Sequence, residues 1–196
     1  IAQRYFEDIA PGPLSGAVAS GDVESHVGSE VRLVLEDRVE LSRLYLVWHT
    51  PAIFAPGDAE LDLLADMLAN GKTSRLYRTL VYERRIAVDV AASQNSHELS
   101  SFFHVIATAA PGHSLAEIER EITAEIARFA VSVSTDELVR CQAQAEAQFT
   151  YRLQTVGGFG GKSDQLNAYN VYVNDPGYFE TDLTRYHDVS SADVQA

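Results

Sequence analysis

The spacing of the apolar residues changes near residue 110, and this change most constrains the fold. Before it, the chain contains segments with the two-residue alternation or the short apolar run typical of β-strands. These segments are residues 30–37, 42–50, 86–93 and 99–109, and the short turn at 94–98 makes the last two a hairpin. After residue 112 only helical patterns remain. Strands followed by helices predict an α+β domain, in which helices pack on one face of a mostly antiparallel sheet.

Helix-start signals are clear along the chain. Asp58 is the expected N-cap of a first helix, and Gly71 follows its end, where a C-terminal glycine belongs. Ser114 and Ser134 each precede a glutamate by three residues, the spacing of a capping box. The expected helices are residues 58–70, 73–84, a stretch beginning at Ser114, 134–154, 162–173, a stretch beginning at Asp175-Pro176, and 190–196.

Composition excludes several classes of protein. The chain has 196 residues, 46% of them hydrophobic and 22% charged, which suits one globular domain with a sizeable core. Its formal net charge of −13 argues against nucleic acid or anionic lipid as a partner. No apolar run approaches the length needed to span a membrane. The chain begins at Ile1 rather than Met, so we expect a fragment or a product of leader removal.

Two triplets resemble the end of a phosphate-binding loop: Gly71-Lys72-Thr73 and Gly161-Lys162-Ser163. That loop requires another glycine five residues before the second one, but these positions hold Asp66 and Val156. In both cases the preceding segment is also an expected helix rather than a strand. We therefore reject nucleotide binding.

Metal and nucleophile motifs are likewise missing from the sequence. The six histidines show no i, i+4 pair, and Gly-x-Ser-x-Gly does not occur. Cys141 lies on an apolar helical stripe, where we expect a small core side chain rather than a reactive thiol. The sequence thus predicts no catalytic, cofactor-binding or metal-binding residue. The histidines are His26, His49, His97, His104, His113 and His187.

Two further clusters are interpreted as structural. Gly157–Gly161 is expected to be a flexible joint between helices, with a hinge or a close approach of peptide backbone as the functional alternative. Arg75 and Glu83 are expected to form ion pairs. An aromatic group is expected to pack in the core or at an interface: Tyr169, Tyr172, Tyr178, Phe179 and Tyr186.

Taken together, several motifs resemble the non-catalytic domains of pitrilysin-type zinc metallopeptidases, the family of insulin-degrading enzyme and the mitochondrial processing peptidase. The most specific is a small-residue turn followed by Ser-Arg-Leu-aromatic, a leucine, an acidic residue and a strand that starts Ile-Ala. The matching residues are Asn70-Gly71, Ser74-Arg75-Leu76-Tyr77, Leu80, Glu83, Ile86-Ala87, Ala107-Thr108-Ala109 with Pro111-Gly112, Asp175-Pro176-Gly177-Tyr178-Phe179, and Arg4-Tyr5-Phe6 with Ile9 and Pro11.

The resemblance implies a role beside a zinc-bearing domain. Members of the family have two homologous halves that close around a peptide chamber, and their catalytic domain carries His-x-x-Glu-His and a distal Glu. None of these ligands is in this chain, so zinc is expected in the parent protein's catalytic domain. The family's last domain presents an Arg and a Tyr toward substrate, where this chain has Val81 and Val88. We expect Val88 on the apolar strand face, and Asn70-Gly71-Lys72 to be too short for a substrate-binding glycine loop.

These points lead to one main interpretation. Residues 1–29 are the end of a preceding domain and a linker, and residues 30–196 are a non-catalytic domain, truncated at its end, that follows the zinc domain. It would line the chamber and support the catalytic helix, with the zinc domain, the second half of the parent protein and peptide substrate as partners. The alternatives are an inactive scaffold of the same fold and an unrelated peptide-binding or assembly domain. Export of bacterial relatives suggests the cell envelope.

Overall fold

The computed structural model describes residues 2–10, 12–13 and 28–196. A short helix, α1 (Ala2–Phe6), contains Arg4-Tyr5-Phe6. Residues 1, 11 and 14–27, which include Pro11, His26 and most of the expected linker, lie outside the described residues.

Three antiparallel strands form the sheet. They are β1 (Arg43–Thr50), β2 (Ala87–Asn95) and β3 (Ser101–Ala109), in the order β1-β3-β2. The pairing sets Leu46 opposite Val105 and Ala92 opposite the same residue, so these three side chains share one face. The expected hairpin of β2 and β3 is confirmed, as is an antiparallel sheet within an α+β fold.

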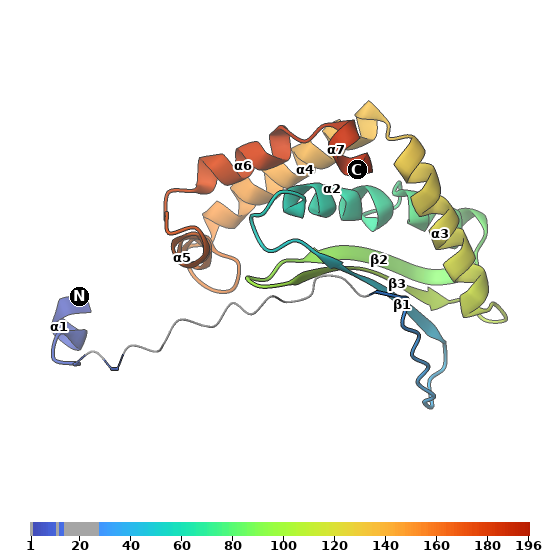
Figure 1. The fold of residues 1–196 in the computed structure, drawn as a ribbon, viewed down its shortest axis with the longest axis horizontal. Coiled ribbons are helices and arrows are strands. Elements are labelled where there is room, and N and C mark those ends of the chain that lie inside the picture. Colours follow the sequence, from blue (N-terminus) through green and yellow to red (C-terminus); the bar gives the residue numbers. More distant parts are fainter. Residues whose placement is uncertain (1, 11, 14–27) are drawn as a thin grey trace.

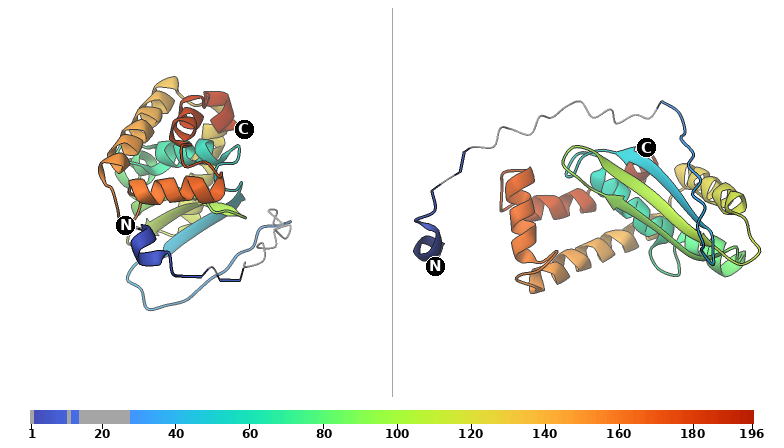
Figure 2. Two further views of the ribbon diagram at one scale, coloured as in Figure 1. Left: turned by 90° about the vertical axis from the view of Figure 1, so that its left-hand side faces the viewer. Right: turned by 90° about the horizontal axis from the view of Figure 1, so that it is seen from below.

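The helices cover one face of this sheet. Helix α2 packs against β2 and also contacts α4, α6 and α7, so it lies between the sheet and the outer helices (Figure 1, Figure 2). Helix α3 contacts β1 and β3. The helices are α2 (Asp58–Ala69), the π-helix η1 (Tyr77–Glu83), α3 (Leu115–Val131), α4 (Thr135–Gln154), α5 (Lys162–Tyr172), α6 (Phe179–His187) and α7 (Ser191–Gln195).

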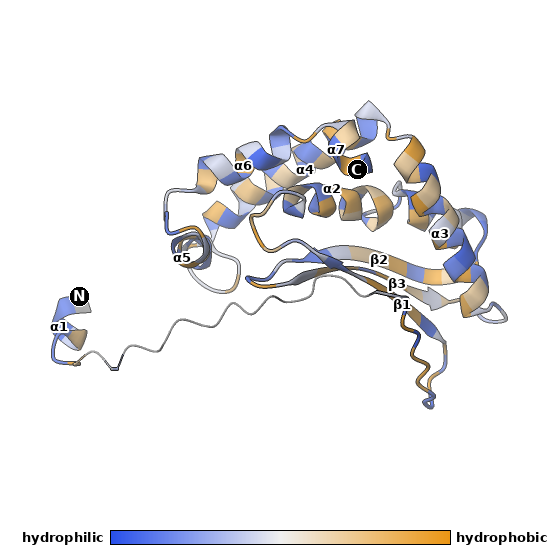
Figure 3. Cartoon of the chain, viewed as in Figure 1, coloured by the Kyte–Doolittle hydropathy of each residue, from blue (hydrophilic) through white to orange (hydrophobic). Residues whose placement is uncertain are grey.

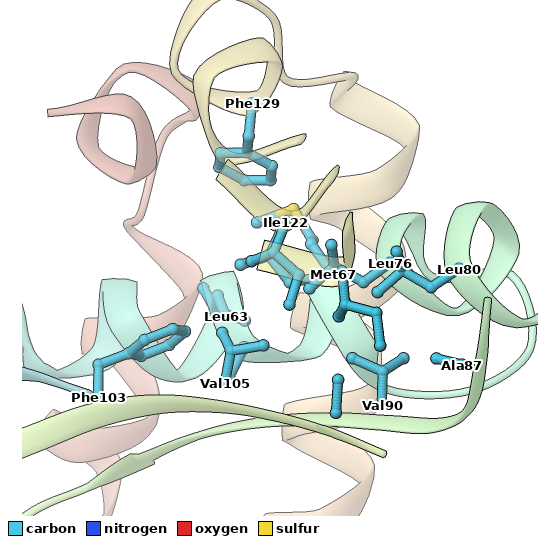
Figure 4. Close-up of a cluster of buried hydrophobic side chains, with 14 of the residues drawn as sticks. Leu63, Met67, Leu76, Leu80, Ala87, Val90, Phe103, Val105, Ile122 and Phe129 are labelled. Atoms are coloured by element: carbon cyan, nitrogen blue, oxygen red, sulfur yellow. The ribbon is translucent and has the colours of Figure 1, made fainter. Parts of the chain in front are cut away.

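The core lies between α2, the inner sheet face and α3. Leu63 and Met67 of α2 meet Val105 of β3 and Ile122 of α3, and all four side chains are fully buried (Figure 4). Leu76 belongs to the same cluster, which explains why the Ser-Arg-Leu-Tyr motif carries a leucine there. Full burial of each such side chain contributes about 1.5–3 kcal/mol.

The helix caps are only partly as expected. Ser114 accepts a hydrogen bond from the Glu117 backbone nitrogen, and Ser134 forms its box with Glu137. The N-cap predicted at Asp58 is wrong, because Gly57 caps α2 and the Asp58 side chain is buried in a polar network. The helix start expected at Asp175-Pro176 is also displaced: α6 begins at Phe179, after a turn in which the Asp175 side chain accepts a hydrogen bond from the Gly177 backbone nitrogen.

The strand predicted over residues 30–37 is wrong. Residues 31–39 form no helix or strand, and their apolar side chains are exposed, with Leu33 at 86% and Leu35 at 93%. Among the described residues, none forms a backbone hydrogen bond with this segment. The alternation of apolar residues suits a strand, but a strand also needs a neighbour with which to pair.

Two further differences occur around the Ser-Arg-Leu motif. The expected α-helix at 73–84 is instead the wider π-helix η1, in which the Arg84 nitrogen donates to the Thr79 oxygen five residues earlier. The prediction that Val88 lies on the apolar face is also wrong. A β-bulge between Ala87 and Asp89 leaves Val88 45% exposed, while Ala87 is buried.

Candidate functional site

The face of the sheet that the helices leave open carries alternate residues of all three strands. The strand register brings these side chains together because directly opposed residues point to the same face. They are Tyr45, Val47 and His49 of β1, Phe102, His104 and Ile106 of β3, and Ala91, Ser93 and Asn95 of β2. This surface, which we call the open sheet face, is mainly apolar and aromatic, with the neutral polar residues Ser93 and Asn95 on β2. At one end the same face continues to Arg43, Thr108 and the charged Asp89 of β2.

His104 is fixed at the centre of the open sheet face. Its Nε2 lies 3.0 Å from Ser93 Oγ, and its Nδ1 lies 2.9 Å from Asn95 Nδ2. An amide nitrogen only donates, so Nδ1 accepts and Nε2 carries the proton. The ring also stacks on Phe102 at 5.8 Å, and Phe102 in turn stacks on His97 at 6.0 Å. Both ring nitrogens of His104 are therefore engaged, and the imidazole acts as a packed polar residue.

A cluster of polar side chains lies where α2, α5 and α6 meet. Arg185 of α6 donates to Asp58 of α2 at 3.1 Å and to Asp182 at 2.8 Å, and its guanidinium lies over the Phe54 ring at 5.4 Å. The Tyr169 hydroxyl of α5 donates to Asp182 at 2.8 Å. A cavity of about 250 Å³ adjoins these side chains. We call these five residues the Arg185 cluster, and they connect three helices.

Asp62 lies beside the Arg185 cluster and borders the same cavity and a second one of about 170 Å³. It accepts a hydrogen bond of 2.6 Å from the Tyr186 hydroxyl. Burial raises the pKa of Asp62 to about 6, although the hydrogen bond from Tyr186 opposes this shift. The same burial and the nearby Asp62 carboxylate raise the pKa of Tyr186. The Asp62 carboxyl therefore titrates closer to neutral pH than an exposed aspartate would, whereas the raised pKa of Tyr186 keeps its hydroxyl protonated.

Arg75 of the Ser-Arg-Leu motif forms a separate clamp. Its guanidinium donates to Glu137 at 2.6 and 3.1 Å and to the Ser132 carbonyl at 2.9 Å, and it lies 4.7 Å from the centre of the Phe129 ring. It thus connects the segment before η1 to the C-terminal end of α3 and to the first turn of α4. The prediction of ion pairing is confirmed for Arg75. It is also confirmed for Glu83, which pairs with Arg78 on the surface at 3.6 Å.

The two glycine-lysine triplets lie at helix boundaries, as the sequence indicated. Gly71 has a φ of 81° in the turn between α2 and η1, and its carbonyl accepts the Ser74 hydroxyl. Gly161 caps α5. The Gly157–Gly161 joint is a hydrogen-bonded turn, because the Lys162 nitrogen donates to Thr155 and the Gly160 nitrogen donates to Asp164.

No zinc site can be assembled from the described part of the chain, where no group of three His, Cys, Asp or Glu residues could hold a metal. The histidines at 49, 97, 104, 113 and 187 lie apart or are engaged; His113, for example, contacts Glu117 at 2.9 Å. The donor set therefore does not fit zinc. None of the described helices is both long and apolar enough to cross a bilayer.

Cys141 is a core residue, as predicted. Its side chain is fully buried in α4, and burial raises the pKa of its thiol to about 11. A thiol of this kind is almost entirely protonated near neutral pH and is shielded from reagents. The expected aromatic packing is also confirmed: Tyr169, Tyr178 and Phe54 form one group, and Phe149, Phe179 and Tyr186 form another.

Sequence reasoning missed the Arg185 cluster. One signal was available in part: Asp58 and Asp62 are four residues apart and so share a helix face, as do Asp182 and Tyr186. The pairing of Arg185 with Asp58, which are 127 residues apart, had no local signature.

Known structures share this fold. A protease from Helicobacter pylori superposes with a TM-score of 0.71 at 24% identity, covering 81% of this chain and 38% of that one. The inactive peptidase domain of a putative zinc protease from Bordetella parapertussis gives a TM-score of 0.67 at 22% identity, covering 83% and 87%. A chain of complex III2 from Candida albicans gives 0.70 at 18% identity, covering 86% and 42%.

These likenesses show the fold, and this chain spans well under half of the Helicobacter protein. Comparison with curated protein sequences finds no match. The family itself is shown by a sequence model described as the peptidase M16 inactive domain, which matches residues 1–145. That stretch runs from α1 into α4 and contains both the Ser-Arg-Leu motif and the whole sheet. The chain therefore belongs to the inactive-domain family of the M16 zinc peptidases, as its motifs indicated.

Proposed function

We propose that this domain follows the zinc domain of an M16 peptidase and forms part of the wall of its peptide chamber. In this proposal residues 1–29 are the end of the preceding domain and a linker, and residues 30–196 are the supporting domain. The observation that carries the proposal is the open sheet face. Helices cover the opposite side of the sheet, so this broad apolar and aromatic surface remains available to a peptide or to a neighbouring domain.

Two other observations support a non-catalytic role. The donor atoms of the described residues do not form a zinc site, and the buried polar residues serve to join helices. The size of the Helicobacter protein, of which this chain covers 38%, leaves room for a catalytic domain elsewhere in a parent of that size. Zinc chemistry would then come from that neighbour, with no step performed by residues of this chain.

The test uses the intact parent polypeptide, and its main variant changes the open sheet face. Val47→Glu places a charge on β1, and it should raise KM for peptide several-fold with zinc content and kcat preserved. Val139→Glu on α4 is the matched control, because Val139 is 56% exposed and Val47 is 58% exposed. Val139→Glu should change neither constant. Equal effects of the two variants on KM would contradict the chamber-wall role. Stoichiometric zinc bound to residues 1–196 alone would contradict the non-catalytic role.

A second candidate is an inactive scaffold of the same fold. It is favoured by the likeness to a chain of complex III2 from Candida albicans. The two candidates differ in the residues that precede this domain in the parent polypeptide. A His-x-x-Glu-His motif there, together with one bound zinc per chain, supports the peptidase. A parent without zinc and without peptide hydrolysis supports the scaffold.

A further inference from the structure

The arm of residues 30–38 carries apolar side chains that are exposed, and among the described residues its backbone pairs with no other backbone group. It precedes β1 and extends away from the sheet (Figure 1), and much of its ribbon has the colour of hydrophobic residues (Figure 3). Its hydrophobic side chains are exposed. Val31 and Val34 have the β-branched side chains that strands favour, and Leu33 and Leu35 add apolar surface between and beside them. The backbone groups of the arm are also free to pair, since none bonds to another backbone group among the described residues. The arm therefore has the composition and the free edge of a strand without a neighbour.

Charged residues at equal distances before and after Val34 have opposite signs in two pairs of positions. In an antiparallel pair, directly opposed residues point to the same face of the sheet. When two identical strands are related by a two-fold axis, opposed residues must therefore be an even number of positions apart, so that the axis passes beside one residue paired with its own copy. Centring on Val34 pairs oppositely charged or apolar residues across the nine positions 30–38, with the exception of Val31 and Asp37. The pairs are Glu30 with Arg38, Arg32 with Glu36, Leu33 with Leu35, and Val34 with itself.

Neighbouring registers are disfavoured by like charges. Centring on Leu33 places Glu30 opposite Glu36, and centring on Leu35 places Arg32 opposite Arg38. Like charges directly opposite each other destabilise a strand pair, whereas opposite charges stabilise it. Exposed ion pairs are weak individually, so their main effect here is to select one register.

We propose that the arm pairs with the arm of a second copy of this chain, as two antiparallel strands centred on Val34. The pairing forms a small isologous interface, in which each strand supplies the hydrogen-bonding edge that the other lacks. Arg32 already holds Glu119 of α3, with one contact at 3.0 Å, and this contact attaches the arm to the body of the domain. A guanidinium has five donors, so Arg32 can keep Glu119 and also meet Glu36 of the second copy. The interface is independent of the open sheet face and of any catalytic role.

A cysteine at the symmetry axis tests the register directly. In the intact polypeptide, Val34→Cys sets the two thiols directly opposite, at a Cβ separation of about 5 Å that a disulfide can close with little adjustment. The matched control is Leu35→Cys, which is equally exposed but would lie two residues out of register with its copy, about 7–8 Å away. We expect Val34→Cys to form the disulfide-linked dimer at least about tenfold faster than Leu35→Cys. Cys141 is fully buried and adds no background.

Charge reversal provides an independent test. Adding Arg38→Glu to Val34→Cys places like charges opposite each other and should slow cross-linking to the rate of Leu35→Cys. Adding Glu30→Arg as well exchanges the two charges and should restore the fast rate. All of these side chains lie at the surface, and unchanged thermal unfolding of each variant would verify the fold. Equal cross-linking of the two cysteine variants, or failure of the exchanged pair to recover, would overturn the proposal. So would a Val34→Cys protein that stays monomeric because the arm pairs within its own polypeptide.

Discussion

Arg75 and Arg185 make similar contacts in two different parts of the helical layer, but their surroundings differ. Each pairs with two carboxylates and lies over a phenylalanine ring. The hydrogen bond from Arg75 lowers the pKa of Glu137, whereas burial raises the pKa of Asp182 beside Arg185. The Arg185 cluster also adjoins a cavity, whereas Arg75 contacts the carbonyl of Ser132. The comparison shows that ion pairing alone does not decide how a carboxylate titrates, because desolvation can outweigh a neighbouring cation.

The largest expected effect is that of Arg75→Ala. This substitution leaves Glu125 and Glu137 without their shared cation and should lower the free energy of unfolding by about 3 kcal/mol. Urea denaturation at pH 7 measures it. Arg78→Ala, which removes only an exposed pair with Glu83, should cost about 0.5 kcal/mol or less. Equal costs of Arg75→Ala and Arg78→Ala would contradict the role of burial in the Arg75 clamp.

The next effect concerns the pH dependence produced by Asp62. Its folded pKa of about 6 exceeds the value of 3.8 expected for an exposed aspartate. The acid form is therefore favoured by folding: this contribution is complete below about pH 4 and is lost as the pH rises through 6. Asp62→Asn keeps an oxygen for Tyr186 and removes the charge. At pH 8 the variant should be more stable than the native protein by about 2 kcal/mol.

Thermal unfolding between pH 4 and pH 8 would measure this difference. The two proteins should converge toward pH 4, because native Asp62 is then protonated. Asp188→Asn, the same substitution at an exposed position at the end of α6, should leave the pH dependence unchanged. A constant difference between native and Asp62→Asn proteins across this range would contradict the role of burial.

The smallest effect is the opposite pH dependence of Glu137. Because the folded pKa of Glu137 is lowered, its contribution is present above the usual glutamate pKa of about 4.5 and is lost as the pH falls through the folded pKa. Glu137→Gln should cost about 1 kcal/mol at pH 7, and the cost should shrink below pH 4.5. Chemical denaturation at pH 7 and pH 3.5 tests this sign. A cost that grows in acid would show that the two regions do not differ as described.

Much of the fold could be predicted because its signals are local. The apolar run at 42–50, the strand at 99–109, the serine caps and the position of Gly71 depend on neighbouring residues, and all were visible in the sequence. The segment at 30–37 shows the limit of this reasoning, since its alternation is real but a strand also needs a partner. Val88 shows another limit, because one extra residue in a bulge reverses which side chains face the core.

The candidate site was less predictable for the same physical reason. The open sheet face depends on strand order and on which side the helices cover, neither of which a single strand specifies. The Arg185 cluster joins residues of α2, α5 and α6 that come together only after the helices have packed. Arg75 was easier to interpret, because the Ser-Arg-Leu motif marked it.

The seclusion of the single thiol has a practical consequence. Cys141 lies on α4 and is buried in the hydrophobic core. Any cysteine introduced at the surface therefore becomes the one readily labelled position of the chain. A fluorophore or spin label can then be attached at a chosen strand or helix without first removing the native residue. Distances between two such labels on this domain thereby become accessible to spectroscopy.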